Sequence, residues 1–333
     1  MKKYLFGVVL LAGLSACSEE PVGEHSVPVP IEITAALPGD GTGSASPASK
    51  AVADPAQSLT LYFARADQDA SGTYGGYAAS AIPATRAAGT GAQALTFTTP
   101  QYYLANRKAS KLTGWYPQAG QYKDGVVSWT KLDGSQDVMT APAQSGSLTS
   151  AKMSFTFSHR LTQLQFYPYA ENDEARAAWG DITLISVSAQ PTGCSYDLAT
   201  NGDDGAVVFN NTLEHYLVKG FTSFQLPVGI DNAKRVGDPM MIAPHSELYS
   251  VRITVKSSTK GYAYMLAPSR TYAAGSVIRM KLKFTRLTYY VEPEISIEDW
   301  VSSDSSTEVK TDPVPEPGVD IGDWTSGGEK ELN

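Results

Sequence analysis

Hydrophobic and polar residues alternate with a period of two along most of this chain. In such a pattern, successive side chains point to opposite faces, so one face can be buried while the other meets water. The pattern therefore predicts half-buried β-strands. The alternating hydrophobic sets are Ile31, Ile33 and Ala35; Leu59, Leu61 and Phe63; Met153, Phe155 and Phe157; Val251, Ile253 and Val255; and Ile278, Met280, Leu282 and Phe284.

Turn-forming residues separate these predicted strands, and helical periodicity is scarce. Each of these turn segments combines glycine with proline, aspartate, asparagine, lysine or alanine. They are residues 38–41, 123–125, 133–134, 201–202 and 274–275. A helix of at most two turns is expected at residues 172–179. Many short strands joined by frequent turns favour an all-β fold built from β-sandwiches.

Three breaks divide the chain. Residues 38–55 are rich in Gly, Ser, Ala and Pro, which predicts an exposed loop. The hydrophobic phase slips by one residue around 158–164, as expected at a bulge or a crossing between domains. After Trp300 the chain is acidic and Pro-rich. We therefore expect sandwiches over residues 17–158 and 159–300, followed by a tail, 301–333.

The first residues resemble a lipoprotein export signal. Lys2 and Lys3 precede an apolar run that is too short to span a membrane, and the run ends at Leu14-Ser-Ala-Cys17. This segment resembles a lipobox, so residues 1–16 are expected to be removed and Cys17 to be acylated, for example with palmitate. A plain secretory signal with an incidental cysteine is the alternative.

Composition excludes several classes of function. The net charge of −8 argues against a nucleic-acid partner. The four histidines are widely spaced, so no metal site is expected, and no catalytic or cofactor-binding motif is present. We expect a protein that is not an enzyme and needs no cofactor. With Cys17 acylated, Cys194 has no partner and is expected to be a small buried side chain.

Aromatic residues are plentiful and allow an alternative interpretation as a sugar platform. In the first half these are Tyr74, Tyr77, Tyr102, Tyr103, Trp115, Tyr116 and Trp129. Such residues more often form strands and fill cores. A surface lipoprotein that binds glycans through exposed aromatics is therefore the second hypothesis.

A series of short motifs, taken in order, resembles the fimbrillin-like family, whose members are lipoprotein-derived pilus subunits of anaerobic Gram-negative bacteria. Each motif is weak alone, but together they span most of residues 10–300. After the lipobox, the resembling segments are 112–117 (LTGWYP), 137–141 (DVMTA), 155–164 (FTFSHRLTQL), 272–275 (YAAG) and 297–300 (IEDW).

The resemblance implies two tandem transthyretin-like, Greek-key β-sandwiches and a mechanism of assembly. The precursor reaches the outer membrane by its lipid, and a trypsin-like protease cuts the loop after the first strand. The groove left by that strand then receives a strand from another subunit. The mature protein becomes part of a surface fimbrium that supports adhesion, with other pilus subunits as partners.

Individual residues can be assigned to these steps. The removable first strand is residues 29–37, with Val29, Ile31 and Ile33 among its hydrophobic residues. Lys50 is the only Lys or Arg between Lys3 and Arg65, so the cut is predicted between Lys50 and Ala51. Arg86, which precedes an alanine as in the family, is the alternative, although a cut there would remove too much.

The C-terminal tail is the candidate donor. It holds eight acidic residues against Lys310 and Lys330, a side-chain charge of −6. Residues 295–303 and 319–327 are similar, each with two β-branched residues before Asp-Trp. Val319 and Ile321 are the expected inserting residues, and an unstructured acidic tail is the alternative. Whether the subunit belongs to the stalk, tip or anchor of a pilus stays open.

Overall fold

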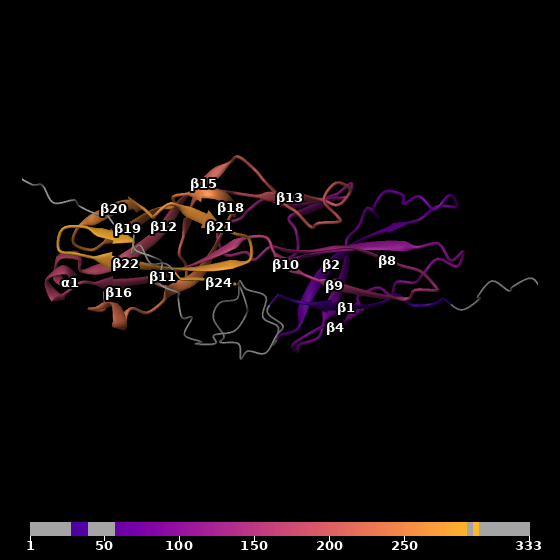
Figure 1. The fold of residues 1–333 in the computed structure, drawn as a ribbon, viewed down its shortest axis with the longest axis horizontal. Helices are drawn as coiled ribbons and strands as arrows, with labels where there is room; N and C mark the ends of the chain where they lie inside the picture. Colours follow the sequence, from indigo (N-terminus) through magenta and orange to yellow (C-terminus); the bar gives the residue numbers. More distant parts are fainter. Residues whose placement is uncertain (1–27, 39–56, 292–295, 300–333) are drawn as a thin grey trace, which may run out of the picture.

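The computed structural model describes residues 28–38, 57–291 and 296–299. The predicted all-β fold is confirmed, and the only α-helix among these residues is the short α1 (Asp173–Trp179). The molecule is elongated, with N-terminal strands at one end and C-terminal strands at the other (Figure 1). The tandem transthyretin-like topology stays a prediction.

One end of the molecule is an eight-stranded sheet that curls around its own core. The strand order is β10-β8-β5-β2-β3-β4-β1-β9. Because β9 and β10 are consecutive in the chain yet occupy opposite ends of this order, the two edges of the sheet must come together. The strands are β1 (Glu32–Ala36), β2 (Leu59–Asp67), β3 (Ile82–Arg86), β4 (Gln93–Phe97), β5 (Ser110–Tyr116), β8 (Met139–Gly146), β9 (Lys152–Thr156) and β10 (Ser158–His159).

Aromatic rings fill the core of this sheet. Phe63 packs edge-on against Phe97, Phe155 and Phe157, with ring centroids 6.0, 5.0 and 6.2 Å away. Gly114 leaves room for them, because a Cβ there would lie 2.8 Å from Phe63 Cε1 and 2.9 Å from Phe157 Cζ. The glycine of the LTGWYP segment is therefore required by packing.

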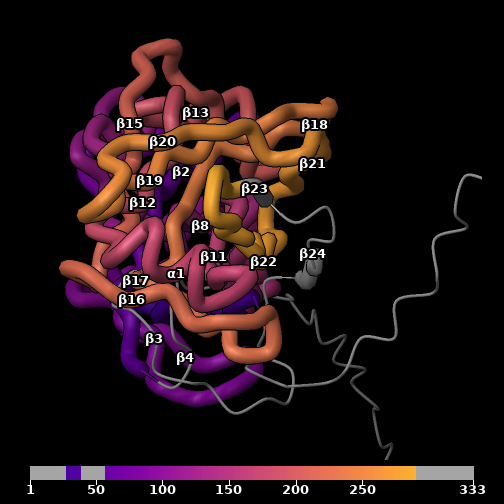
Figure 2. Tube along the Cα trace, turned by 90° about the vertical axis from the view of Figure 1, so that its left-hand side faces the viewer, coloured from indigo at the N-terminus to yellow at the C-terminus, as the bar shows by residue number. Residues whose placement is uncertain are grey.

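The other end of the molecule has two five-stranded sheets. One follows the order β17-β11-β22-β23, with β24 also paired to β22, and the other follows β15-β12-β19-β20, with β16 also paired to β12. Figure 2 shows the two layers, with β12, β19 and β20 above β11 and β17. The strands are β11 (Thr162–Ala170), β12 (Asp181–Pro191), β15 (Leu213–Leu217), β16 (Phe224–Gln225), β17 (Val236–Ile242), β19 (Arg252–Ser257), β20 (Gly261–Leu266), β22 (Ser276–Phe284), β23 (Tyr289–Val291) and β24 (Ser296–Asp299).

The inner faces of both sheets share one hydrophobic core. Phe166 and Met280 come from one sheet, and Ile185 and Val255 from the other. Strands β23 and β24 extend one of these sheets, because both pair antiparallel with β22. The helix matches expectation: the Asn172 side chain caps it by accepting a hydrogen bond from the Ala175 amide.

The chain crosses between the two ends where the hydrophobic phase slips. Strand β10 completes the eight-stranded sheet, and β11 begins the next sheet three residues later. At this crossing His159 Nδ1 lies 2.8 Å from Asp137 Oδ1, and both side chains are buried. This contact links two of the segments that resemble the fimbrillins.

A small sheet draws strands from both sides of this crossing. It consists of β6 (Gln121–Lys123), β7 (Val126–Trp129), β13 (Cys194–Asp197) and β14 (Val208–Phe209), in the order β14-β13-β7-β6. Cys194 faces Trp129 in it and is buried, as expected, and burial raises the pKa of its thiol to about 12. The domain boundary at residue 158 stays a prediction.

The remaining elements are the paired β18 (His245–Tyr249) and β21 (Arg270–Tyr272), and the 3-10 helix η1 (Ile230–Asn232).

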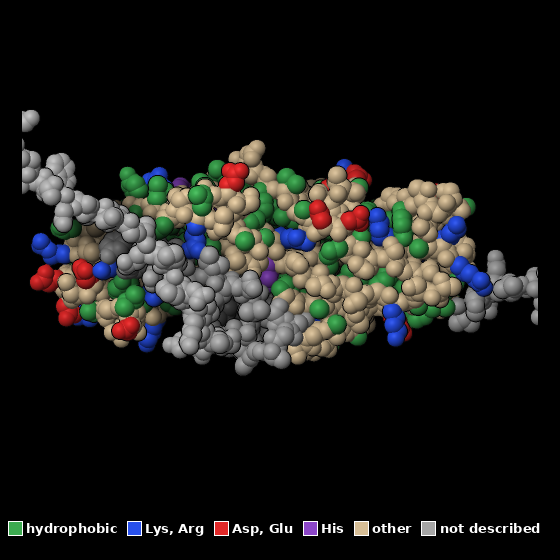
Figure 3. Space-filling model, viewed as in Figure 1, with side chains coloured by type: hydrophobic (Ala, Val, Ile, Leu, Met, Phe, Trp, Pro, Cys, Tyr) green, Lys and Arg blue, Asp and Glu red, His purple; other side chains and the backbone are tan. Residues whose placement is uncertain are grey.

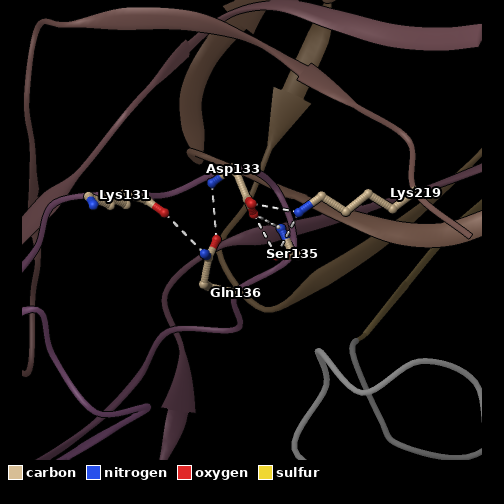
Figure 4. Close-up of polar contacts among 5 residues, drawn as sticks. All are labelled: Lys131, Asp133, Ser135, Gln136 and Lys219. Carbon is tan, nitrogen blue, oxygen red and sulfur yellow. Dashed lines mark hydrogen bonds and ion pairs between the residues drawn. The ribbon is translucent and has the colours of Figure 1, made fainter.

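A polar contact also joins a turn that precedes the crossing to a segment that follows it (Figure 4). Lys219 Nζ, just after β15, lies 2.5 Å from Asp133 Oδ2 in the turn that follows β7. Gln136 and Ser135 hold that turn through hydrogen bonds to Asp133. Burial raises the pKa of Asp133, but the hydrogen bonds from Lys219 and Ser135 outweigh it and hold that pKa below its ordinary value.

Candidate functional site

The first strand, β1, lies inside the eight-stranded sheet rather than at its edge. It pairs antiparallel with β4, where Ile33 faces Leu95, and parallel with β9, where Ile33 faces Met153. Among the described strands, β1 is the only one that forms a ladder with β9. Figure 1 shows β1, in indigo, beside β9 and β4. The groove between β4 and β9 is the candidate functional site.

Alternate side chains of the segment fill this groove. Ile31, Ile33, Ala35 and Leu37 are buried, each at most 5% exposed. Their neighbours in the core include Phe155 of β9. Full burial of an isoleucine or leucine contributes about 1.5–3 kcal/mol, so the segment is held firmly by its apolar face. Without it, the groove would expose apolar side chains and two unpaired strand edges.

Backbone hydrogen bonds extend the pairing beyond both ends of β1. The Ile31 amide donates to the Gln101 carbonyl at 2.8 Å, and the Tyr103 amide donates to the Val29 carbonyl at 3.0 Å. At the other end, the Phe157 amide donates to the Ala36 carbonyl at 3.0 Å. The strand itself, Glu32–Ala36, is shorter than the predicted segment 29–37, so Val29 and Ile31 precede it and Ile33 lies within it. Their role as a removable strand stays a prediction.

Arg86 closes the groove at the C-terminal end of β1. Its side chain is fully buried, and its Nε donates a hydrogen bond of 3.1 Å to the Ala35 carbonyl. Its two Nη atoms donate to the carbonyls of Ala87, Gly89 and Gly91 at 3.2, 2.9 and 2.8 Å. A buried guanidinium needs such acceptors. Arg86 therefore ties β1 to the loop between β3 and β4.

The burial of Arg86 bears on the two alternatives for proteolysis. Arg86 is the last residue of β3 and is inaccessible in the folded protein. It therefore cannot be the trypsin-like site of the folded precursor. Lys50 and Ala51 lie outside the described residues, within the connection from β1 to β2.

Other predicted site residues also lie outside the described residues: Cys17, Val319 and Ile321. The roles assigned to them stay predictions. Sequence reasoning missed the part that Arg86 plays in the groove. Arg86 shares its face of β3 with buried Ala84, a position at which the alternation predicts a core residue.

Three of the seven first-half aromatics proposed for a sugar platform are buried and cannot contact a ligand. Trp115, Trp129 and Tyr103 are buried, and Trp115 stacks on Tyr62 in the protein. Only Tyr102 of the seven is exposed. The three buried rings fill the core, because their bulk suits strand packing.

Two further observations concern the described residues. They contain no group of three or more His, Cys, Asp or Glu side chains placed to hold a metal ion. None of their helices has the length and hydrophobicity needed to cross a membrane.

Comparisons with known proteins identify the relatives of this chain. A proposed cell adhesion protein from Bacteroides uniformis has a similar structure, with a TM-score of 0.57, 17% identity, and 82% of this chain and 98% of that one covered. One from Bacteroides ovatus has a TM-score of 0.51, 15% identity, and coverage of 82% and 98%. At these identities the likeness shows the fold alone.

No curated protein matches the chain. A family model described as fimbrillin-like matches residues 56–300, which is more than half of the sequence. Among the described residues, the motif series that resembled this family falls in β5, at the start of β8, across β9 to β11, just before β22 and at the end of β24. The chain belongs to the fimbrillin-like family.

Proposed function

We propose that the protein is a subunit of a surface pilus, structural or accessory, and that β1 is a temporary strand replaced during assembly. Family membership supports a pilus or adhesion protein. The observation that carries the exchange step is the position of β1, which fills the groove between β4 and β9 and alone forms a ladder with β9 among the described strands.

Cleavage starts the proposed exchange. A trypsin-like protease cuts between Lys50 and Ala51, in the connection that leaves the C-terminal end of β1. The segment 17–50, with its lipid on Cys17, is then tied to the subunit only by non-covalent contacts. The lipid thus delivers the precursor to the outer membrane and is lost from the mature subunit in the fimbrium.

An incoming strand has to reproduce two features of β1. It needs backbone groups to pair with β4 and β9, and apolar side chains at alternate positions to occupy the sites of Ile31 and Ile33. The tail offers Val319 and Ile321 at this spacing. We propose that the tail of another subunit supplies the strand.

Trypsin treatment of the lipid-free precursor tests this function. The expected result is cleavage after Lys50 followed by a ladder of SDS-resistant oligomers. Lys50→Ala should abolish the ladder, whereas Lys123→Ala, which removes a lysine that is 72% exposed in the β6–β7 hairpin, should leave it intact. Cleavage after Lys50 with no oligomers at any protein concentration would count against polymerisation.

A further inference from the structure

The strand β20 carries three large apolar side chains on its outer face. Tyr262, Tyr264 and Leu266 are 66%, 68% and 62% exposed, while Ala263 and Met265 between them face the core and are partly buried. Exposed apolar residues are usually scattered singly. Here they form one row along the outermost strand of the sheet β15-β12-β19-β20.

Two cations of the neighbouring strand β19 lie against the tyrosine rings. Arg252 Cζ is 4.2 Å from the ring centroid of Tyr264, and Lys256 Nζ is 5.1 Å from that of Tyr262. In the register, Lys256 faces Tyr262 and Arg252 faces Leu266, so these side chains share one face. In the space-filling view, hydrophobic and basic side chains lie together at the upper left, where Figure 1 places β20 (Figure 3).

The charge of this face is opposite to that of the whole chain. The outward positions of β19 and β20 are occupied by Arg252, Thr254, Lys256, Tyr262, Tyr264 and Leu266, with no acidic residue among them. The chain as a whole carries −8. A local pair of cations beside largely exposed aromatic rings therefore favours an anionic ligand with apolar surface.

We propose that this Tyr262–Tyr264 face binds an acidic polysaccharide whose sugar rings carry carboxylates. The carbon-bound hydrogens of a pyranose ring pack on the exposed tyrosine faces, and carboxylates of the ligand pair with Arg252 and Lys256. Two residues apart on a strand, the tyrosines are roughly 7 Å from each other, which suits contacts to neighbouring sugars.

An added peptide strand fits these observations less well. Strand addition would draw its affinity from backbone groups along the edge of β20 that pairs with none of the described strands. The tyrosine rings and the two cations instead project from the face of the sheet. A flexible acidic polysaccharide can lie across that face. The acidic tail of the protein, residues 301–333, is thus the competing ligand to exclude by experiment.

Affinity electrophoresis of the uncut, lipid-free protein tests the proposal. Polygalacturonate is the probe, and its fully methyl-esterified form is the neutral control with the same backbone. We expect retardation by the acidic polymer only. Tyr262→Ala with Tyr264→Ala should weaken binding roughly tenfold, and Arg252→Gln with Lys256→Gln by a similar factor.

Two variants act as matched controls. Tyr102→Ala removes a tyrosine that is 44% exposed at the other end of the molecule, and Lys123→Gln removes a distant exposed lysine. Both should bind as wild type. Because all of these side chains are exposed, every variant should fold, and circular dichroism checks that it does.

Three results would overturn the proposal. These are no retardation of wild type by polygalacturonate, equal retardation of wild type and both double variants, and equal retardation by the esterified polymer. A peptide of residues 301–333 that binds with the same residue dependence, while polygalacturonate does not, would reassign the face to an acidic peptide. None of these results bears on strand exchange, because the uncut protein is used.

Discussion

Arg86 Nε donates a hydrogen bond of 3.1 Å to the carbonyl of Ala35, although the two residues lie on strands separated by β4. The same guanidinium binds the carbonyls of Ala87, Gly89 and Gly91 in the loop after β3. The end of β1 from which the predicted cleavable loop departs is thus fastened to the rest of the sheet. In the proposed exchange, this fastening opposes premature release of the strand.

Replacing Arg86 should loosen β1. In Arg86→Met the apolar stem is kept, but four carbonyls lose a donor, at a cost of about 1–3 kcal/mol in the free energy of unfolding. Amide hydrogen exchange of residues 32–36 should accelerate more than that of β5. Arg235→Met, at an exposed arginine, is the control. Equal acceleration in both strands would mean that Arg86 stabilises the fold without acting on β1.

Gly114→Ala should destabilise the N-terminal core. The new methyl group would meet Phe63 and Phe157 at under 3 Å, and neither ring has room to retreat within the packed core. Overpacking of this kind costs about 1–3 kcal/mol, measurable as a lower urea midpoint. Gly76→Ala is the matched control, because nothing lies within 4 Å of its added Cβ. Similar midpoints for the two variants would show that the core adapts.

The contact between Asp133 and Lys219 should make a small, pH-dependent contribution to stability. Since the pKa of Asp133 is lowered in the folded protein, this contribution is present above the ordinary value of 3.8 and disappears as the pH falls through the folded pKa. Both side chains are about half exposed, so the effect stays below about 1 kcal/mol.

Urea titrations at several pH values measure this contribution. Asp133→Asn should be less stable than wild type near neutral pH, and the difference should vanish in acid. Asp124→Asn, at a carboxylate that is 86% exposed, should match wild type throughout. A difference between Asp133→Asn and wild type that grows as the pH falls has the wrong sign for this account.

Cys194 should be inert while the protein is folded. Its thiol is buried and its pKa is raised to about 12, so almost no thiolate forms near pH 8. In Cys17→Ser, where Cys194 is the only cysteine left, a thiol-specific dye should label the protein only after denaturation. Rapid labelling of the native protein would show that the sheet of β6, β7, β13 and β14 opens readily.

The strands of this fold could be predicted from sequence, but the partners of those strands could not. The alternation of Ile31, Ile33 and Ala35 marks a buried face, yet it does not say that the strand pairs with β9, 120 residues further along. Parallel pairing across such a distance depends on the closure of the whole sheet.

The other features that could not be predicted from the sequence involve charged and polar residues. Arg86 looked like an exposed target because arginine is rarely buried, and only its position on the core face of β3 hinted otherwise. Asp137 and His159 belong to separate segments of the motif series, and their buried contact at 2.8 Å depends on how β8 pairs with β10. The exposed tyrosines of β20 were overlooked, since an alternating pattern does not show which face meets water when both faces hold apolar residues.

The most direct test of the central claim is to lock β1 in its groove. Thr34 and Ser154 face each other in the β1–β9 ladder, with 3.1 Å between their hydroxyl oxygens, so cysteines there can form a disulfide. After trypsin treatment, the oxidised Thr34→Cys/Ser154→Cys protein should give no SDS-resistant ladder, and reduction should restore it. The single variant Thr34→Cys should behave as wild type. A full ladder from the oxidised double variant, with its disulfide verified by mass spectrometry, would contradict the account, because subunits would then polymerise without releasing β1.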